Sequence, residues 1–545
     1  MSRADVHVTE PTRRSLRGRS LGGRSSWWVV FVAALVGIGT VNALWALTTP
    51  LGASPDEPAH VIKAASVVRG ELLGEVTDNP QIRDVDVPAG VAYTADTLCT
   101  KFYPEVTADC APGFPSDPDS LVEDEPTSAG LYNPVYYVLV GWPTLLWDGS
   151  KVALFAMRIA SALICSVFFA AAVASLSRLR RPALPVLVAI GSLTPTTYFL
   201  SGVVNPNAFE AATAMAFAAA LFAGLDRSER ATWGQGLLLA ASGGLLVHAR
   251  GLSPLWLGLV VVVAAVWSGW PRFWSYVRQG PVLTAVVAVA SSSALAVVWT
   301  LASGSLPAVG RYPGQGTTFV GGLVRMLERT FDFGRDLVGN FGWLDTPVPS
   351  YVVFAYFLGA GALVAVALLV PARGRTKVAV VLATASYLFV PALIQAASVT
   401  KSGYVWQGRY NLPLYFLLVI VAAMAVAPVF DRLADVVRRR IIGLVVILHA
   451  AGALVALLTF MRRNSVGLSA SWVTLFRDPA WSPPVVPTTA WTAIMVAGAV
   501  VLAACFSFVV RRAGRRTDPR EGLLPMERLG TGIVPAPVHD DRPVA

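Results

Sequence analysis

The stretch "WWVVFVAALVGIGTVNALWALTT" at residues 27–49 decides the class of protein, because it is apolar over almost its whole length. The apolar core of a signal peptide is about 7–15 residues long, whereas a helix needs about 20 residues to cross a bilayer. The basic segment "RRSLRGRSLGGR" at residues 13–24 precedes it, and basic residues favour the cytoplasmic side. We therefore predict a retained first transmembrane helix behind a basic cytoplasmic N-terminus, residues 1–26.

Similar apolar runs recur along the chain. Of its 545 residues 55% are hydrophobic and only 14% are charged, against roughly 25% charged residues in soluble domains. The sequence therefore predicts an all-α integral membrane protein with one polytopic domain over residues 27–510. About 12 transmembrane helices are expected, at residues 27–49, 151–176, 182–201, 207–225, 232–247, 252–270, 281–302, 351–370, 377–398, 411–429, 441–460 and 489–510.

The connections between these helices predict their orientation. With the N-terminus inside, the cytoplasmic connections are rich in arginine: "RLRR" (178–181), "DRSER" (226–230), "PRFWSYVR" (271–278), "PARGRTK" (371–377) and "DRLADVVRRR" (431–440). This agrees with the positive-inside bias, so both termini are predicted to be cytoplasmic, with residues 511–545 as a disordered tail. The same placement explains the net charge of +10 without a nucleic-acid partner.

Three long loops are predicted on the outer face, at residues 50–150, 303–350 and 461–488. The first contains "LYNPVYYVLVGWPTLLW" at residues 131–147, which is short, interrupted by proline and rich in Tyr and Trp, the residues that favour the membrane interface. We predict an interfacial helix there rather than a crossing. Cys99 and Cys110 lie in the same loop, where an oxidising compartment favours a disulfide; two free thiols are the alternative.

The first loop opens with "SPDEPAHVIKAASVVRG" at residues 54–70, which places Asp56 and Glu57 at the membrane surface. Ser54 and Glu57 have the spacing of a capping box, and Pro58 suits a first helical turn. A helix cap alone thus explains both acids. It does not explain why His60 follows on the same helical face as Asp56.

Other polar groups gather on the predicted outer face, namely His248, Arg250, Asp332, Asp336, Lys401 and Arg409. The bases among them can bind an anionic headgroup, with snorkelling to lipid phosphates as the alternative. Inside the helices ionisable residues are few, mainly Arg158, Glu210 and His449, whereas a coupled carrier keeps such groups near the midplane. The pattern favours chemistry at the outer surface, on a substrate carried in the outer leaflet.

The acidic pair after the first helix, and the aromatic interfacial helix followed by "MRIASAL" (157–163), resemble the type C (GT-C) superfamily of polytopic, lipid-phosphosugar-dependent glycosyltransferases. More closely, the chain resembles an uncharacterised, domain-of-unknown-function family of bacterial membrane proteins that are regarded as GT-C-like. Five motifs between about residues 27 and 430 carry this resemblance: "DEPAH" (56–60), "YNPVYY" (132–137), "NPNAF" (205–209), "FGWLD" (341–345) and "GRYNLP" (408–413). It implies a GT-C-like architecture in a bacterial plasma membrane.

The superfamily resemblance also implies roles for residues. Asp56 would be the catalytic base of an inverting transfer, and Glu57 would support it or share metal or acceptor binding. The candidates for binding the donor phosphate are Arg409, Arg250 and Lys401, and further pocket candidates are His60, His248, Tyr410, Asp332, Asp336 and Asp345. The sequence requires no cofactor. A divalent metal ion is the one candidate, with Asp56, Glu57 and His60 as its ligands.

These observations predict a glycosyltransferase that moves a sugar from a polyprenyl-phosphate donor to a cell-envelope glycan or glycolipid acceptor. Attack by an acceptor hydroxyl needs a base, and the departing phosphate needs positive charge. Two other classes stay open. One is a transporter or flippase for a lipid-linked envelope precursor, and the other is a non-catalytic membrane protein of envelope assembly, in which the two acids would be helix caps.

Overall fold

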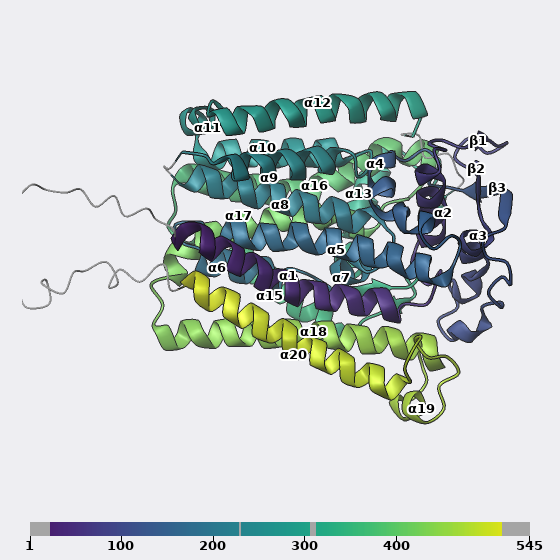
Figure 1. Cartoon of the computed structure of the whole chain (residues 1–545). Helices are drawn as coiled ribbons and strands as arrows, with labels where there is room; N and C mark the ends of the chain where they lie inside the picture. The colour runs from purple at the N-terminus through teal and green to yellow at the C-terminus, as the bar shows by residue number, and fades with distance from the viewer. Residues whose placement is uncertain (1–21, 228–229, 306–311, 515–545) are drawn as a thin grey trace, which may run out of the picture.

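The computed structural model describes residues 22–227, 230–305 and 312–514 (Figure 1). Within these ranges nine helices are long and apolar enough to cross a membrane. They are α1 (Gly22–Thr48), α5 (Lys151–Leu176), α8 (Pro206–Asp226), α12 (Gly280–Ser303), α15 (Ser350–Leu369), α16 (Gly374–Ser402), α17 (Leu412–Phe430), α18 (Asp435–Val466) and α20 (Thr488–Gly514). The predicted termini fall largely on residues 1–21 and 515–545, which lie outside the described residues.

Two further apolar segments each consist of two consecutive helices that meet at an angle. Helices α6 (Ala183–Gly191) and α7 (Pro195–Ser201) meet at 67°, and α10 (Ser253–Ser268) and α11 (Trp270–Val277) meet at 119°. The first break precedes a proline, which disfavours helical geometry in the preceding residue. The second lies at Gly269, whose φ of 82° is incompatible with a continuing helix.

The described helices therefore give nine spans, or eleven if each bent pair crosses, and the predicted number of about twelve is not confirmed. The difference is α9 (Trp233–Val247), which has 15 residues. At 1.5 Å per residue it is about 22 Å long, shorter than the roughly 30 Å of a bilayer core.

The helices are arranged around a buried centre. Helix α8 is buried along its whole length, and α17 is almost as enclosed, whereas α12 and α15 keep most of their surface exposed. The outer helices expose large apolar side chains such as Leu295 and Phe354. Such an exposed apolar surface suits contact with lipid, so the architecture is that of an integral membrane protein.

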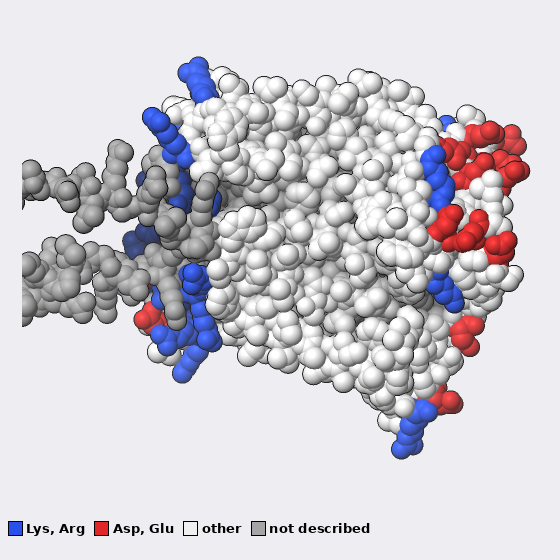
Figure 2. All heavy atoms as spheres, in the orientation of Figure 1, with Lys and Arg blue, Asp and Glu red and all other residues white. Residues whose placement is uncertain are grey.

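On the face that Figure 2 shows, the charged side chains of the described residues lie at the two ends of the molecule. Figure 2 shows a broad uncharged surface between one end that carries mostly Lys and Arg and another that carries most of the acids. We call the first the basic end; it holds the connections at residues 178–181 and 371–377. The second, the loop end, holds residues 50–150. Helix α1 begins and α20 ends at the basic end (Figure 1).

The predicted helical fold class is confirmed, and the loop end adds a few short strands to it. Strands β1 (Glu75–Val76), β2 (Arg83–Pro88) and β3 (Leu121–Thr127) form an antiparallel sheet, and β4 (Asn340–Phe341) pairs with β5 (Thr346–Pro347). The short helices here are α2 (Glu57–Val68), α3 (Ala89–Asp96), α4 (Pro134–Gly141), α13 (Phe319–Glu328), α14 (Thr330–Gly339), α19 (Trp472–Arg477) and the 3-10 turn η4 (Gly408–Asn411).

The predicted interfacial segment at residues 131–147 is short, as expected. It forms α4, of eight residues, followed by the 3-10 turn η3 (Trp142–Leu145), which together are too short to cross a bilayer. Trp142 and Trp147 expose nearly half of their surface, and tryptophan favours the membrane interface.

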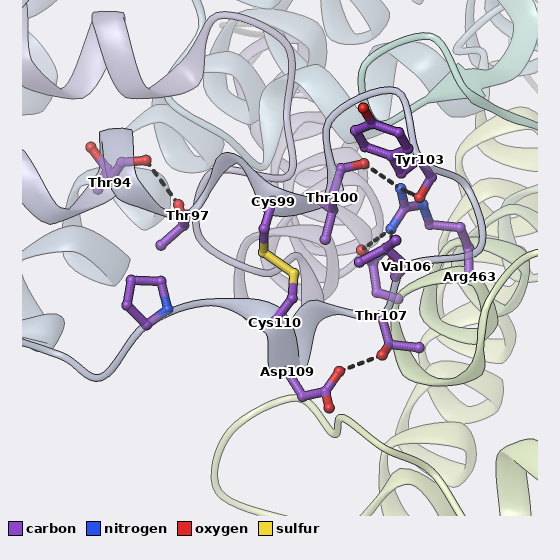
Figure 3. Close-up of a disulfide and its surroundings, with 12 residues drawn as sticks. Thr94, Thr97, Cys99, Thr100, Tyr103, Val106, Thr107, Asp109, Cys110 and Arg463 are labelled. Carbon is purple, nitrogen blue, oxygen red and sulfur yellow. Dashed lines mark hydrogen bonds between the residues drawn. A yellow bond between two sulfur atoms is a disulfide. The ribbon is translucent and has the colours of Figure 1, made fainter.

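A disulfide joins Cys99 and Cys110 in the first loop (Figure 3). The buried guanidinium of Arg463, at the end of α18, donates to the backbone carbonyls of Thr100, Tyr103 and Val106 at 2.8–3.0 Å. The linked segment is thereby fixed to the transmembrane helices by a side chain more than 350 residues away in sequence.

Replacing both Cys99 and Cys110 by serine is expected to lower the free energy of unfolding by about 2–3 kcal/mol, because a short closed loop restricts the unfolded chain. Thermal unfolding in a neutral detergent checks this, with Cys505→Ser as the control. An unchanged midpoint in the double variant and in the reduced wild-type protein would contradict it.

Candidate active site

Asp56 lies at the N-terminus of α2 in a left-handed backbone conformation, with φ 64° and ψ −1°. Aspartate tolerates this region better than most residues, yet it is uncommon outside glycine. The side chain makes no capping hydrogen bond, and the Ser54 hydroxyl is buried without a partner. The predicted capping box is therefore wrong, and the conformation of Asp56 turns its carboxylate away from the helix end.

Glu57 points into the protein, where its exposed fraction is 2%. Its carboxylate accepts from Nε and Nη2 of Arg158 at 2.7 and 2.6 Å, and from the backbone N–H of Val204 at 3.1 Å. The carboxylate of Glu57 is therefore bonded to groups that hold the protein together, namely Arg158 and the backbone of Val204. This placement argues against Glu57 as a ligand of metal or acceptor, because its carboxylate is buried in a bidentate ion pair.

Arg409 is the ion-pair partner of Asp56, with Nη2 and Oδ2 at 2.5 Å. The two side chains differ sharply in exposure, at 3% for Arg409 and 47% for Asp56. Nε and Nη1 of Arg409 are buried without a hydrogen-bond partner. Buried N–H groups usually have partners, so this guanidinium has unused capacity for an anion.

The position of Arg409 depends on its neighbour Gly408 in η4. A Cβ atom on Gly408 would lie 1.9 Å from the carbonyl oxygen of Phe333 and 2.8 Å from Cβ of Asp336. Only glycine permits this close approach of η4 to α14. Any larger residue would move Arg409 away from Asp56.

Arg250 brings a second positive charge to the cluster. Its guanidinium lies 4.2 Å from the ring centre of Tyr410, and that of Arg409 lies 5.5 Å from the same ring. Nη1 of Arg250 also donates to Oδ1 of Asn207 at 2.5 Å. Asn207 Nδ2 donates to Asn205, whose own amide donates to the carbonyl of Pro55. Arg250 is thus tied to the peptide that precedes Asp56.

His60 lies one helical turn beyond Asp56 and is buried between aromatic rings. Nδ1 is 2.9 Å from the hydroxyl of Tyr137, and the rings of Tyr132 and Tyr137 lie 5.8 and 5.9 Å away. Burial lowers the pKa of His60 to about 3. The imidazole is therefore neutral at physiological pH and adds no charge to the site.

The pKa of Asp56 is set by two opposing effects. Burial among protein atoms raises it, but the neighbouring Arg409 guanidinium and, more weakly, Arg250 lower it further than burial raises it. The net shift is downward. Asp56 is therefore a carboxylate at neutral pH.

The remaining predicted residues lie outside this cluster. Asp332 is exposed beside Arg329, and Asp345 pairs with Arg463 at 3.3 Å. Lys401 is exposed at the end of α16. His248 and Asp336 already have hydrogen-bond partners of their own. Nδ1 of His248 lies 3.0 Å from Nδ2 of Asn133, and Oδ1 of Asp336 accepts from Nδ2 of Asn340 at 2.9 Å. The structure brings together Asp56, His60, Arg250, Arg409 and Tyr410.

The geometry does not fit the candidate divalent metal. No three His, Cys, Asp or Glu side chains gather into a metal site among the described residues. Glu57 is held by Arg158, Nδ1 of His60 by Tyr137 and Asp56 by Arg409. Cationic neighbours around Asp56 favour an anion instead.

Sequence reasoning missed three members of the site, namely Asn207, Tyr132 and Tyr137. All three belong to the quoted motifs "NPNAF" and "YNPVYY", so the signal was present in the sequence. The motifs do not show which of their uncharged side chains would face the charged cluster.

The residue range of the motifs agrees with a family match. Residues 40–418 match the model of the predicted membrane protein family DUF2142. The chain belongs to the DUF2142 family. This confirms the predicted membership of an uncharacterised membrane protein family. No curated protein matches the chain.

Solved structures similar to this DUF2142 protein include ArnT from Cupriavidus metallidurans, apo and bound to undecaprenyl phosphate. The apo form is 13% identical (TM-score 0.44) and the bound form 14% (0.42); each match covers 91% of this chain and 78% of ArnT. The Archaeoglobus fulgidus oligosaccharyltransferase in the apo form is 13% identical (0.36), covering 86% of this chain and 59% of that one. These likenesses are distant.

Replacing Arg158 by methionine is expected to destabilise the protein by about 3–5 kcal/mol, because it leaves the buried Glu57 carboxylate unpaired. The double variant Arg158→Met with Glu57→Gln should be much less destabilised than the sum of the single variants. Thermal unfolding in detergent measures this coupling, with Arg325→Ala in the exposed Arg325–Glu328 pair as control. Additive effects at the buried pair would refute the account.

Proposed function

We propose that this protein is a membrane glycosyltransferase that moves a sugar from a polyprenyl-phosphate donor to a cell-envelope glycan or glycolipid, with inversion, at the outer face of a bacterial plasma membrane. One observation carries the proposal. The half-exposed carboxylate of Asp56 contacts the buried guanidinium of Arg409, whose Nε and Nη1 have no hydrogen-bond partner. A base and an anion-binding group thus share one site.

The orientation of the site is part of the proposal. The connections at the basic end are rich in arginine, and such connections favour the cytoplasm. The loop end carries the Cys99–Cys110 disulfide, and disulfides persist in oxidising compartments. Both features support a loop end on the outside, with both termini in the cytoplasm.

The proposed reaction is a single displacement. The acceptor hydroxyl oxygen attacks the anomeric carbon of the donor while the bond from that carbon to the phosphate oxygen breaks. The hydroxyl proton passes to the carboxylate of Asp56. The leaving polyprenyl phosphate gains negative charge, which the free N–H groups of Arg409 and the guanidinium of Arg250 stabilise.

The contact with Arg409 has a consequence for the base. A carboxylate whose pKa is lowered by an adjacent guanidinium is a weak proton acceptor. When a donor phosphate binds Arg409, its negative charge offsets that guanidinium, and the pKa of Asp56 rises. Donor binding therefore strengthens the base at the moment when the acceptor needs it.

Asp56→Asn is expected to fold and insert but to lose transfer by about 10²–10⁴-fold, because the amide cannot accept the proton. Asparagine tolerates the left-handed backbone of position 56, so a folding defect is not expected. The measurement is transfer of radiolabelled sugar from polyprenyl-phosphate donors by membranes, together with the envelope-glycan profile of a deletion strain carrying each variant.

Asp332→Asn, in an exposed acid away from the site, is the matched control and should restore the wild-type profile. A wild-type glycan profile in the Asp56→Asn strain, with an altered profile in the deletion strain, would exclude Asp56 as the base. Movement of the donor from one leaflet of a proteoliposome membrane to the other, without sugar transfer, would identify a flippase instead.

The pH dependence of transfer should reflect donor binding. In the free protein the lowered pKa of Asp56 keeps the carboxylate ionised as the pH falls, so kcat/KM should hold to a pH below the usual carboxylate range. In the donor complex the pKa is higher, so kcat should fall at a higher pH than kcat/KM. Coincident acid limbs in the two profiles would contradict this account.

A further inference from the structure

The first outer loop carries two adjacent aromatic rings that are mostly exposed. Phe102 and Tyr103 expose 63% and 64% of their surface, and both belong to the segment that the Cys99–Cys110 disulfide closes (Figure 3). Single exposed apolar residues are common on protein surfaces, whereas adjacent ones indicate a contact surface. The site around Asp56 and Arg409 does not account for this pair.

The backbone at Phe102 adopts a conformation that its residue type disfavours. The amide of Tyr103 donates to the carbonyl of Thr100 at 3.2 Å, with Lys101 at φ −64° and ψ 117° and Phe102 at φ 64°. These angles match a type II turn, whose third residue is usually glycine because φ is positive there. Phenylalanine at this position neither suits the turn nor packs in the core, so its ring points to a use outside the fold.

This turn is held firmly in spite of its strain. The buried guanidinium of Arg463 donates to the carbonyls of Thr100 and Tyr103, on either side of Phe102, at 2.8 and 3.0 Å (Figure 3). The disulfide closes the same segment. A surface that is already rigid loses little conformational entropy when a ligand binds. The two rings are therefore preorganised for a contact.

Lys101 and Trp343 adjoin the two rings. Nζ of Lys101 lies 4.0 Å from the ring centre of Trp343 and 5.4 Å from that of Phe102, and the rings of Phe102 and Trp343 meet edge to face at 6.0 Å. Within the described ranges no carboxylate pairs with Lys101, so its N–H donors are available to a ligand. We call Lys101, Phe102, Tyr103 and Trp343 the aromatic patch.

The aromatic patch lies beside the peptide that leads to Asp56. The indole N–H of Trp343 donates to the carbonyl of Gly52 at 3.2 Å. Asp56 is four residues further along the chain, and an extended chain of that length spans at most about 14 Å. The patch and Asp56 are therefore close enough for one extended ligand to contact both.

The groups in the patch suit a sugar better than a lipid chain. One face of a sugar ring consists of C–H groups, which pack against the negative face of an aromatic ring. The hydroxyl groups at its edge can bond to a lysine ammonium or a tyrosine hydroxyl. Glu105 and Asp109 are exposed on the same closed segment, and carboxylates disfavour insertion into hydrocarbon.

We propose that Phe102 and Tyr103 form a stacking surface for a sugar ring of a cell-envelope glycan, with Lys101 bonding to the hydroxyl groups at the edge of that ring. The identification of this glycan as the acceptor rests on the proposed function. In that role the patch holds one part of the acceptor while another part lies at Asp56.

The first test uses the full chain in lipid nanodiscs, with delipidated and deproteinised cell-envelope polysaccharide from the source bacterium as the probe. Hydroxyl-radical labelling and mass spectrometry measure how far each ring is oxidised. Phe102 and Tyr103 should be oxidised without the polysaccharide and protected when it is added, whereas the labelling of the exposed residues Phe476 and Tyr351 should not change. Rings that the bilayer alone protects, or that gain no protection from the polysaccharide, would overturn the proposal.

The second test removes both rings. Phe102→Ala with Tyr103→Ala should raise the dissociation constant for the same polysaccharide about tenfold or more, because each lost aromatic contact weakens binding severalfold. Both side chains are exposed, so the variant is expected to fold. Phe476→Ala with Tyr351→Ala removes the same two residue types elsewhere and should leave the constant unchanged. An unchanged constant in the first variant, or equal losses in both, would refute the stacking surface.

Repeating the binding measurement in Asp56→Asn separates this inference from the proposed function. That variant lacks the proposed base but keeps the patch, so it should bind the polysaccharide as the wild-type protein does. A wild-type glycan profile in the Asp56→Asn strain would remove the catalytic role and leave the patch as a sugar-binding surface. Sugar transfer together with undiminished polysaccharide affinity in the Phe102→Ala, Tyr103→Ala variant would remove the patch and leave the reaction.

Discussion

The arrangement of the loop end depends on the buried guanidinium of Arg158. It makes five hydrogen bonds, two to the Glu57 carboxylate and three to the carbonyls of Ala46, Thr49 and Pro50. These contacts join the end of α1 and the start of α2 to α5 at one point. Because Glu57 is drawn inward, the adjacent Asp56 must face the other way, and its left-handed backbone completes the turn. A side chain inside α5 thus fixes the direction of the acid at the surface.

Asp56 and Arg409 are 353 residues apart in sequence and in contact in space. Neither side chain forms a recognisable binding site without the other. Arg409 is almost fully buried, whereas about half of the Asp56 side chain remains accessible, so the guanidinium has lost far more of its hydration than the carboxylate. A buried cation with unmade hydrogen bonds is costly unless something else binds it. That cost is the physical reason to regard this end of the molecule as a binding site rather than a helix cap.

The sequence was sufficient to predict the membrane class, most of the helices and the five charged or aromatic residues that meet at the loop end, Asp56, His60, Arg250, Arg409 and Tyr410. All five motifs converge there, and "FGWLD" shows how: Phe341 packs against Trp45 and Phe199, and Trp343 donates to the carbonyl of Gly52. Which charge pairs with which could not be predicted. Ser54 and Glu57 have the spacing of a capping box, but a buried guanidinium is a stronger partner for a carboxylate than a helix N–H. The bends at Pro195 and Gly269 depend on local backbone geometry, to which hydropathy is blind, so the number of crossings could not be read from apolar runs.

The left-handed conformation of Asp56 distinguishes between two roles for this residue, one for its backbone in the turn and one for its carboxylate in the site. If position 56 served only the backbone, glycine would be the most favourable residue, since it has no Cβ to clash at positive φ. A β-carbon is retained there, and its carboxylate is used for a contact with Arg409 rather than for the helix end. Residues held in such sparsely populated conformations persist when the surroundings over-determine them, and they cluster at functional sites. Here the surroundings are the Arg158 network on one side and the Asn205–Pro55 hydrogen bond on the other, so the backbone cannot relax without losing the direction of the carboxylate.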